Sequence, residues 1–524
     1  DSLRTSFHML HDVPIQKIHD EVEFEVKVFA ELFSKSDPPG AIIKSFIRPF
    51  DLSLAPLLRV GLVKNLDGSY ILSIDMHHII TDGTSQEVLK QDFMSLYRGE
   101  ALSYLRLQYK DFAEWQNSSK EKEQLKKQEL YWLKELAGEI PVLELPTDYP
   151  RPLVQSFAGN RVAFEIEETR TLNEIALRSG ATLFMVLAGV LNILLTKLSG
   201  REDIIIGVPV AARRHADLEK IIGMFVNTLA LRNYPNGEKS FPGFLDELKD
   251  RTLAAFENQE YSFEDLVEKV VIHRDMSRNP LFDVLLAVQN VKKTLAEGLD
   301  GFKSAGKEED IIQVSKFDLE INAWEIGERL KVVFAYCTKL FKQETIERFI
   351  IYFKKIISII IQKPGIRIKD IEIITDEEKE QILHDFNQTG TVYPKHKTIH
   401  QLFAEQVSQT PDHVALIGAG PRACPHCLTY RQLNKQSDRL AGALIEKGVL
   451  TDDIVAIMME RSVEMIISIL GILKAGGAYL PIDPGYPKER IDYMLKDSKV
   501  KIIINSDFLI NAPQAPLHHH SSFN

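Results

Sequence analysis

Strand-like apolar runs alternate with helix-periodic segments along most of this chain. SYILSIDMHH at 69–78 is rich in β-formers, and SQEVLKQDFMSLYRGE at 85–100 has apolar residues at helical spacing. LFMVLAGVLNILLTKLSG at 183–200 predicts a largely buried helix that ends at its glycine, and DIIIGVPVAA at 203–212 predicts a buried strand. Because the two periodicities alternate along the chain, the sequence predicts an α/β fold.

Length and composition narrow the class of protein. The chain has 524 residues, enough for about three or four domains, with 44% hydrophobic and 26% charged residues, as in soluble globular proteins. A net charge of −11 gives no reason to expect nucleic acid as a partner. Three cysteines exclude a disulfide scaffold and suit a reducing compartment. Because no apolar run reaches the roughly 18 residues that span a bilayer, we expect a cytoplasmic protein with no membrane partner.

Prolines and changes of composition divide the chain into regions. The segment ELPTDYPRP at 144–152 contains three prolines, which mark a connector. The chain begins with Asp1 and not with Met, in a stretch without signal-peptide character, so we interpret the chain as a fragment of something longer. The expected regions are 1–145, 146–370, a linker at 371–392, a further α/β region at 393–512 and a tail at 513–524.

The segment MHHIITDGTS at 76–85 lies where a predicted strand meets a predicted helix, with Ser85 as the expected N-cap of that helix. A metal site fits this segment poorly. Adjacent histidines on a strand point to opposite faces, so His77 and His78 cannot easily bind one ion. His78 and Asp82 supply only two ligands, whereas catalytic zinc usually has three from the protein.

Two other interpretations of this segment remain open on the residues alone. Both imidazoles can be packed and hydrogen-bonded, with Asp82 and Gly83 simply forming the turn. Alternatively, one histidine faces a cleft as a general base or positioned hydrogen-bond donor. In that case Asp82 would pair with an arginine, and Gly83 would let the backbone approach a substrate.

Six segments in a fixed order identify a family. They are DSLRTSF (1–7), MHHIITDGTS (76–85), YKDFAEW (109–115), IGMFVNTLALR (222–232), NQEYSFEDLV (258–267) and RDMSRNPLFD (274–283). Motif by motif, the set resembles the condensation domain of non-ribosomal peptide synthetases, whose HHxxxDG signature is matched at 77–83. The resemblance covers about 1–370.

A second resemblance begins near residue 385. LTYRQLN at 428–434 and LKAGGAYLPIDPGYPKERIDYML at 473–495 resemble the first two core motifs of the adenylation domain that follows condensation domains. The phosphate loop TSGTTGxPKG of that family and the GGxS motif of carrier domains do not occur in these 524 residues. We therefore expect the N-terminal part of an α/β adenylation domain, which is inactive by itself.

The first resemblance implies two lobes like chloramphenicol acetyltransferase, forming a V-shaped pseudo-dimer with a tunnel between them. An upstream carrier domain would deliver an aminoacyl or peptidyl thioester, and a downstream carrier domain would present an aminoacyl acceptor. The acceptor amine attacks the thioester and an amide forms. The expected partners are these two peptidyl carrier domains and the chain's own adenylation domain. Both substrates ride on phosphopantetheine, and the resemblance implies no directly bound cofactor or metal.

The resemblance also assigns residues. The implied catalytic set is His77, His78, Asp82 and Gly83, with His78 handling the proton or orienting the amine. Asp82 would form a buried ion pair, for which the family uses the first arginine of RHExLRTxF. The chain opens with Asp1 at the position of that motif's Glu, so Arg4 matches the second arginine, with a structural role, and the first arginine is absent. We therefore expect Asp82 to lack its partner and the fold to be impaired.

Other residues have two interpretations each. Asn279 could line the acceptor side of the tunnel together with Ser85, or Asn279 could serve a turn before Pro280. Asn227 could contact the other lobe, although packing is the favoured role. Trp115 is expected in the core. The CPHC segment at 424–427 and the histidines at 518–520 are not expected to bind metal.

Three other functions are alternatives. An epimerisation domain shares HHxxxDG, but IGMFVNTLALR and the adenylation-like segment that follows argue against it. A heterocyclisation domain would carry aspartate at the position of His77. An inactive docking or gatekeeping fragment is a further alternative. The motifs favour an L-configured donor over a D-configured one.

Overall fold

The structure is a computed structural model, which describes residues 1–29, 46–64, 70–271, 275–290, 314–418, 426–505 and 508. Its residues divide into two compact units, Asp1–Leu383 and His384–Asn524. Helices and strands alternate in both, so the predicted mixed α/β fold is confirmed. The expected boundary between 145 and 146 falls inside the first unit and stays a prediction, and the tail at 513–524 lies outside the described residues.

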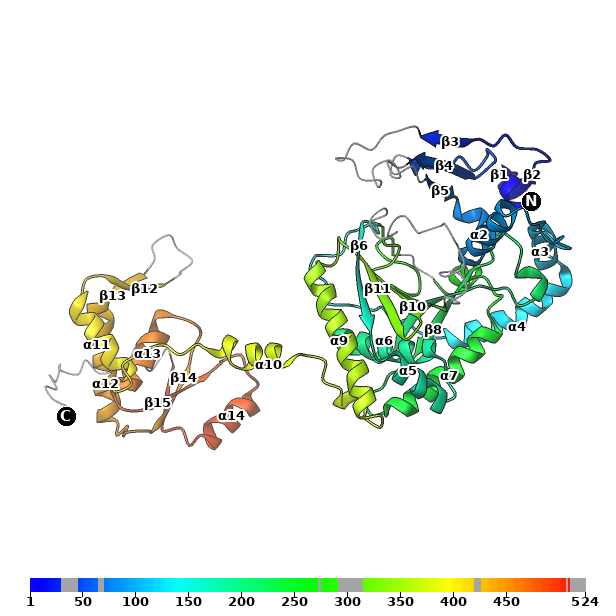
Figure 1. Ribbon diagram of the computed structural model, residues 1–524. Coiled ribbons are helices and arrows are strands. Elements are labelled where there is room, and N and C mark those ends of the chain that lie inside the picture. The colour runs from blue at the N-terminus through cyan, green and yellow to red at the C-terminus, as the bar shows by residue number, and fades with distance from the viewer. Residues whose placement is uncertain are drawn as a thin grey trace. The chain divides into compact units, whose positions relative to one another are not determined.

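A six-stranded sheet forms the centre of the first unit (Figure 1). Its strand order is β6-β11-β10-β9-β7-β8, with the β9–β10 and β7–β9 pairs parallel and the others antiparallel. The strands are β6 (Gly159–Ile166), β7 (Ile204–Val210), β8 (Asn227–Asn233), β9 (Val284–Asn290), β10 (Leu319–Ile326) and β11 (Arg329–Cys337). The predicted strand at 203–212 is therefore confirmed as β7.

Helix α6 (Leu183–Ser199) is the most deeply buried helix of this unit. It packs against α5 (Thr169–Arg178), α7 (Phe241–Glu257) and α9 (Gln343–Gln362), which explains why its sequence is apolar on every side. Gly200 ends α6 in the left-handed conformation, φ 71°, that glycine adopts without strain. The predicted buried helix is confirmed.

The N-terminal part of the same unit contains two smaller sheets. Strands β1 (Thr5–Leu10) and β2 (Val13–Ile18) form a hairpin. Strand β4 (Leu58–Lys64) pairs in parallel with β3 (Val26–Phe29) and antiparallel with β5 (Tyr70–Met76). The remaining helices in the described part of this unit are α2 (Gly83–Tyr97), α3 (Tyr109–Gln116), α4 (Ser119–Glu135), α8 (Phe263–Val270) and α10 (Asp376–Leu383).

The second unit has a parallel three-stranded sheet at its core. Strand β14 (Ile454–Met458) lies between β15 (Ala478–Ile482) and β16 (Ile502–Ile504), parallel to both. The other elements are α11 (Ile399–Gln409), β12 (Val414–Gly418), β13 (His426–Thr429), α12 (Tyr430–Glu446), α13 (Val463–Lys474) and α14 (Lys488–Asp497). The residues expected as a linker, 371–392, include helix α10 of the first unit and continue into the second unit.

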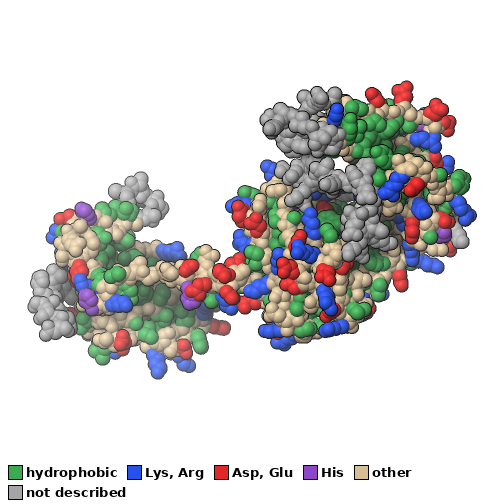
Figure 2. Space-filling view, in the orientation of Figure 1, with side chains coloured by type: hydrophobic (Ala, Val, Ile, Leu, Met, Phe, Trp, Pro, Cys, Tyr) green, Lys and Arg blue, Asp and Glu red, His purple; other side chains and the backbone are tan. Residues whose placement is uncertain are grey.

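Charged side chains of both signs are interspersed over the visible surface. On the face drawn in Figure 2, the described Lys and Arg side chains lie among Asp and Glu side chains. Among the described residues, no single helix is long and apolar enough to cross a membrane. Helices α5 and α6 pass that test only as a pair, and they are bent by 100° at their junction.

A buried charge cluster holds the start of strands β9 and β10. Arg151 forms an ion pair with Asp318, and Arg278 donates to Oδ2 of Asp283 at 2.8 Å. The side chains of both aspartates are almost fully buried. Burial, reinforced by the negative charge of Asp318, raises the pKa of Asp283 to about 6 despite the two arginines.

This raised pKa predicts a pH-dependent stability. A carboxyl with a higher pKa in the folded protein contributes stability that is complete below its unfolded value of about 4 and is lost as the pH rises through about 6. We therefore expect Asp283→Asn, which mimics the neutral form, to flatten the decline in unfolding free energy between pH 4 and 7. Urea titrations followed by tryptophan fluorescence measure this unit alone, since all three tryptophans lie within residues 1–383.

Asp275→Asn is the comparison for this prediction. Hydrogen bonds from Ser277 lower the pKa of the exposed Asp275 carboxyl, so its contribution has the opposite pH direction. An unchanged slope between pH 4 and 7 in Asp283→Asn would contradict the proposed role of that carboxyl.

Candidate active site

His77 and His78 lie just after strand β5, not on it. Strand β5 ends at Met76, and His78–Ile80 form a single 3₁₀ turn. The prediction that the strand extends to His78 was therefore wrong, and the rule that neighbouring strand residues point to opposite faces does not apply to these two histidines. Their orientation follows from the turn and its capping contacts.

His77 is anchored by its neighbours. Its backbone N–H donates to the carbonyl of Leu57 at 3.0 Å, and its Nδ1 accepts from the N–H of Ile79 at 3.1 Å. Nδ1 is thus an acceptor, which leaves Nε2 to carry the proton of the neutral ring. The edge of the ring meets Phe50 at a centroid distance of 6.1 Å. His77 therefore shapes the turn.

Phe50 is itself held in place by Arg59 of strand β4. The Arg59 guanidinium lies 3.6 Å from the centre of the Phe50 ring and donates to Asp75 at 3.0 Å. It also donates to the backbone carbonyls of Arg48 and Pro49. These contacts fix the segment that carries Phe50 against the histidine turn.

His78 differs from His77 in having an exposed side chain. No described residue forms a hydrogen bond with its imidazole, and its carbonyl accepts from the N–H of Thr81 at 3.2 Å. The next glycine, Gly83, is also exposed, and a Cβ built there would meet no atom within 4 Å. The described residues thus leave open space beside His78 and Gly83.

Asp82 is the N-cap of helix α2, and its carboxylate is buried. Oδ1 accepts from the N–H of Ser85 at 2.7 Å, and Oδ2 accepts from the N–H of Phe225 at 3.0 Å. Asp82 rather than Ser85 therefore caps the helix, so the prediction for Ser85 was wrong. Because the cap residue is a carboxylate, its charge also suits the positive end of the helix.

Arg213 neutralises Asp82. Its Nη2 lies 3.0 Å from Oδ1 and 3.2 Å from Oδ2, and the two side chains are only 4% and 3% exposed. The expectation that Asp82 lacks a partner was therefore wrong. The partner follows strand β7, in AARRHAD, and the only sequence signal for it was a pair of arginines at the end of a buried strand.

Ser85 joins the same network. Its hydroxyl donates to the carbonyl of Gly223 at 2.7 Å and accepts from Nη2 of Arg213 at 2.8 Å and from the N–H of Gly223 at 3.0 Å. The residue is fully buried. A residue that lines a tunnel must be accessible, whereas Ser85 is enclosed by the protein.

The segment 211–226, between β7 and β8, carries these contacts, and we call it the bridging loop. Arg213 ties the loop together by donating from Nη1 to the carbonyls of Leu218 and Ile221. Gly223 lets the loop approach helix α3, because a Cβ there would lie 2.1 Å from the ring of Tyr109. The loop therefore joins the turn that carries His78 to the large sheet.

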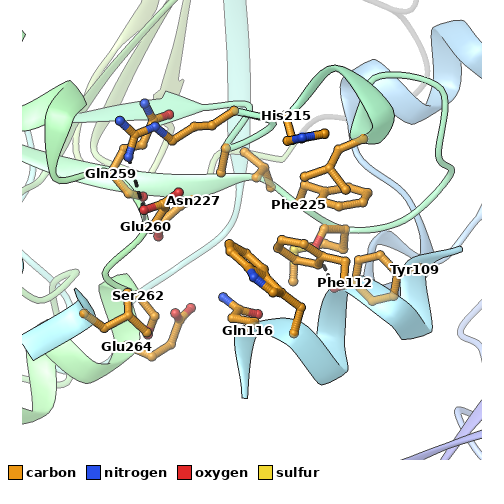
Figure 3. Close-up of a pocket in the computed structure, with 17 residues that line it drawn as sticks. Tyr109, Phe112, Gln116, His215, Phe225, Asn227, Gln259, Glu260, Ser262 and Glu264 are labelled. Carbon is orange, nitrogen blue, oxygen red and sulfur yellow. Dashed lines mark hydrogen bonds and ion pairs between the residues drawn. The ribbon is translucent and has the colours of Figure 1, made fainter. Parts of the chain in front are cut away.

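A cavity of about 360 Å³ opens on the other side of the bridging loop (Figure 3). Trp115 lines it and is 48% exposed, so the expectation of a core position was wrong. Neither His77, His78 nor Asp82 lines this cavity. Its other lining residues include Phe112, Phe225, Asn227, Glu260 and Glu264.

The remaining predicted residues make backbone contacts. Asn227 donates to the carbonyls of Gln259 and Tyr261, which ties β8 to the segment before α8. Asn279 donates to the carbonyl of Lys316 at 2.8 Å. Arg4 donates to the carbonyl of His19 at 2.8 Å and forms an ion pair with Asp1.

The described part of the chain contains no cluster of side chains suited to bind a metal ion. Among those residues, no group of three or more His, Cys, Asp or Glu side chains is arranged to hold an ion. The CPHC segment lies partly outside the described residues and the histidines at 518–520 lie wholly outside them.

Comparison with known families separates the chain into two parts. Residues 1–383 match the family described as "Condensation domain", and residues 403–521 match the family described as "AMP-binding enzyme".

Curated relatives match nearly the whole chain. Gramicidin S synthase 2 of Brevibacillus brevis is 46% identical over 516 residues, which is 98% of this chain and 11% of the relative. Bacitracin synthase 3 of Bacillus licheniformis is 47% identical over 512 residues, which is 97% of this chain and 8% of the relative. The chain therefore spans about a tenth of the length of these relatives.

Solved structures share the fold. The four-domain nonribosomal peptide synthetase holo-AB3403, bound to AMP and glycine, superposes with a TM-score of 0.79 at 23% identity over 98% of this chain and 41% of that chain. The X-domain from teicoplanin biosynthesis superposes with a TM-score of 0.59 at 22% identity, over 71% of this chain and 86% of that chain.

The buried ion pair between Asp82 and Arg213 should contribute strongly to the stability of the first unit. Removing one partner of a buried pair leaves an uncompensated charge, so we expect Arg213→Met to lower the unfolding free energy by about 3–5 kcal/mol. Arg214→Met is the matched control. The partly exposed pair between Arg214 and Glu260, at 3.2 Å, should be worth only about 0–1 kcal/mol. Urea titration measures both losses.

A double variant separates the ion pair from general damage to the loop. Adding Asp82→Asn to Arg213→Met removes the stranded charge and should recover part of the stability. If Arg213→Met and Arg214→Met lowered the unfolding free energy equally, the Asp82–Arg213 pair would not have the dominant role.

Proposed function

Since the chain belongs to the condensation-domain family over residues 1–383, we propose that it forms a peptide bond between two carrier-bound substrates in non-ribosomal peptide synthesis. The observation that carries the proposal is that one HHxxxDG turn contains both an exposed His78 and a buried Asp82, whose carboxylate is bound by Arg213 and by the N–H of Phe225. The first residue is open to a substrate, and the second holds the turn in shape.

In the proposed reaction, the α-amino group of the acceptor attacks the carbonyl carbon of the donor thioester. A tetrahedral intermediate forms and then collapses to an amide, and the donor's carrier leaves as a free thiol. His78 orients the amine and accepts the proton that it loses. Gly83, which has no side chain, would let the substrate backbone pass close to the turn.

In the proposed reaction, both substrates are thioesters that are held in position by their carrier domains. Phosphopantetheine arms on an upstream donor carrier domain and a downstream acceptor carrier domain would hold the two thioesters. Holding both ends can supply roughly 7–11 kcal/mol of the barrier reduction, whereas a general base typically contributes about 10²–10⁴ in rate. We therefore propose that positioning outweighs proton transfer.

Several finer features belong to the same proposal. The donor would be L-configured, Asn279 would line the acceptor side, and the protein would act in the cytoplasm. Residues 403–521 would not adenylate an amino acid by themselves, because the family's phosphate loop does not occur in the sequence.

A docking or gatekeeping role is the second candidate, and one comparison favours it. The X-domain from teicoplanin biosynthesis has been solved in complex with OxyB, with a TM-score of 0.61 and 22% identity to this chain. The same fold is thus found in a complex between two proteins.

A condensation assay tests the proposal. The chain is mixed with a donor-loaded and an acceptor-loaded carrier protein, and the acceptor thioester is analysed by mass spectrometry. We expect a dipeptidyl product, with a rate about 10²–10⁴ lower in His78→Ala if the histidine acts as a general base. His396→Ala, an exposed histidine of the second unit, is the matched control and should retain the full rate.

The same samples distinguish the alternatives when the reaction is run in D₂O. Deuterium at the α-carbon of the donor without a dipeptide would replace the proposal with epimerisation. Carrier binding with neither product nor deuterium would replace it with docking.

A further inference from the structure

The cavity beside the bridging loop is distinct from the histidine turn. Helices α3, α4 and α8, the bridging loop, the start of β8 and the segment before α8 surround its volume of about 360 Å³. Figure 3 shows Glu264 and Gln116 on one side of this space and Phe225 with His215 on the opposite side. The proposed reaction uses none of these side chains.

Aromatic rings form one wall of the cavity. Phe112 lies 5.8 Å from Trp115 and 4.7 Å from Phe225, measured between ring centroids. Trp115 is 48% exposed and the neighbouring Met224 is 36% exposed. An exposed tryptophan in a hollow offers a large flat surface, which suits a planar ligand group.

The charges around the cavity are not balanced. Glu260 accepts from Gln128 at 2.9 Å and from Arg214 at 3.2 Å, so both Glu260 and Arg214 are already engaged. Glu264 is exposed at the rim, and no described residue forms a hydrogen bond or ion pair with its carboxylate. The cavity is therefore lined by aromatic rings and by a carboxylate, Glu264, with which none of the described residues forms an ion pair.

The chain itself shows which cation suits such a wall. On the buried side of the bridging loop, the Arg213 guanidinium lies 4.0 Å from the centre of the Phe225 ring while it pairs with Asp82. A guanidinium is planar, remains charged, and can stack on a ring while it donates to a carboxylate. An aliphatic ammonium has no flat face to stack.

We propose that this cavity binds an arginine side chain of a partner polypeptide, with the guanidinium stacked on Trp115 and paired with Glu264. Charge complementarity and the open aromatic wall select this occupant over an apolar one. Phe225 lines the cavity with its ring and donates its N–H to Asp82, so the occupied site touches the residue that fixes the histidine turn. Binding at this cavity does not require that the chain carry out the reaction proposed above.

Two small probes of nearly identical shape test the charge requirement. The full chain is titrated with N-acetyl-arginine amide, which carries one positive charge, and with N-acetyl-citrulline amide, which carries none. Saturation-transfer NMR of the probe's acetyl methyl group gives each Kd. We expect the arginine probe to bind about three- to tenfold more tightly, as an exposed cation–π contact and ion pair allow.

Three variants locate the site. Glu264→Gln should reduce binding of the arginine probe to the level of the citrulline probe, and Trp115→Leu should weaken both probes. Glu114→Gln is the matched control, because Glu114 is exposed on the same helix as Trp115 but does not line the cavity. It should bind like the unaltered chain.

The proposal is overturned if the two probes bind equally, if neither shows saturable binding, or if Glu114→Gln weakens binding as much as Glu264→Gln. Glu264→Gln changes an exposed side chain in the first turn of α8, so we expect only a small loss of stability. The result for this variant therefore stands even if Trp115→Leu fails to fold.

Discussion

The buried ion pair between Asp82 and Arg213 is the contact on which the candidate site depends. A desolvated carboxylate is tolerated only when charge and hydrogen bonds replace its lost water. Here Arg213 supplies the charge, and the backbone N–H groups of Ser85 and Phe225 complete the bonds. Since these donors come from both halves of the first unit, the HHxxxDG turn takes this form only when the bridging loop is in place.

The same loop contributes to two sites. On one side, Phe225 donates its N–H to Asp82, and on the other its ring lines the aromatic cavity. His78 remains open while Asp82 is enclosed, so the turn combines an accessible imidazole with a rigid support. This division between an open and a structural residue is the basis of the chemistry we propose.

Much of the local structure could be predicted from the sequence. Helix α6 and strand β7 were found because a long all-apolar run suits a buried helix and a short one suits a buried strand. The motif around His78 was placed correctly between a strand and a helix. The capping residue was misassigned because Asp82 and Ser85 are both good N-caps, and the contacts of distant residues decided between them.

The sequence by itself determined the elements and the family, because helical periodicity, caps and motif order are properties of neighbouring residues. Only the tertiary structure decided that Arg213, 131 positions away, neutralises Asp82, and that Trp115 faces a cavity instead of the core. Ion pairing and burial depend on which distant segments meet. That information is contained in no single stretch of the chain, because it arises from the packing of all of them together.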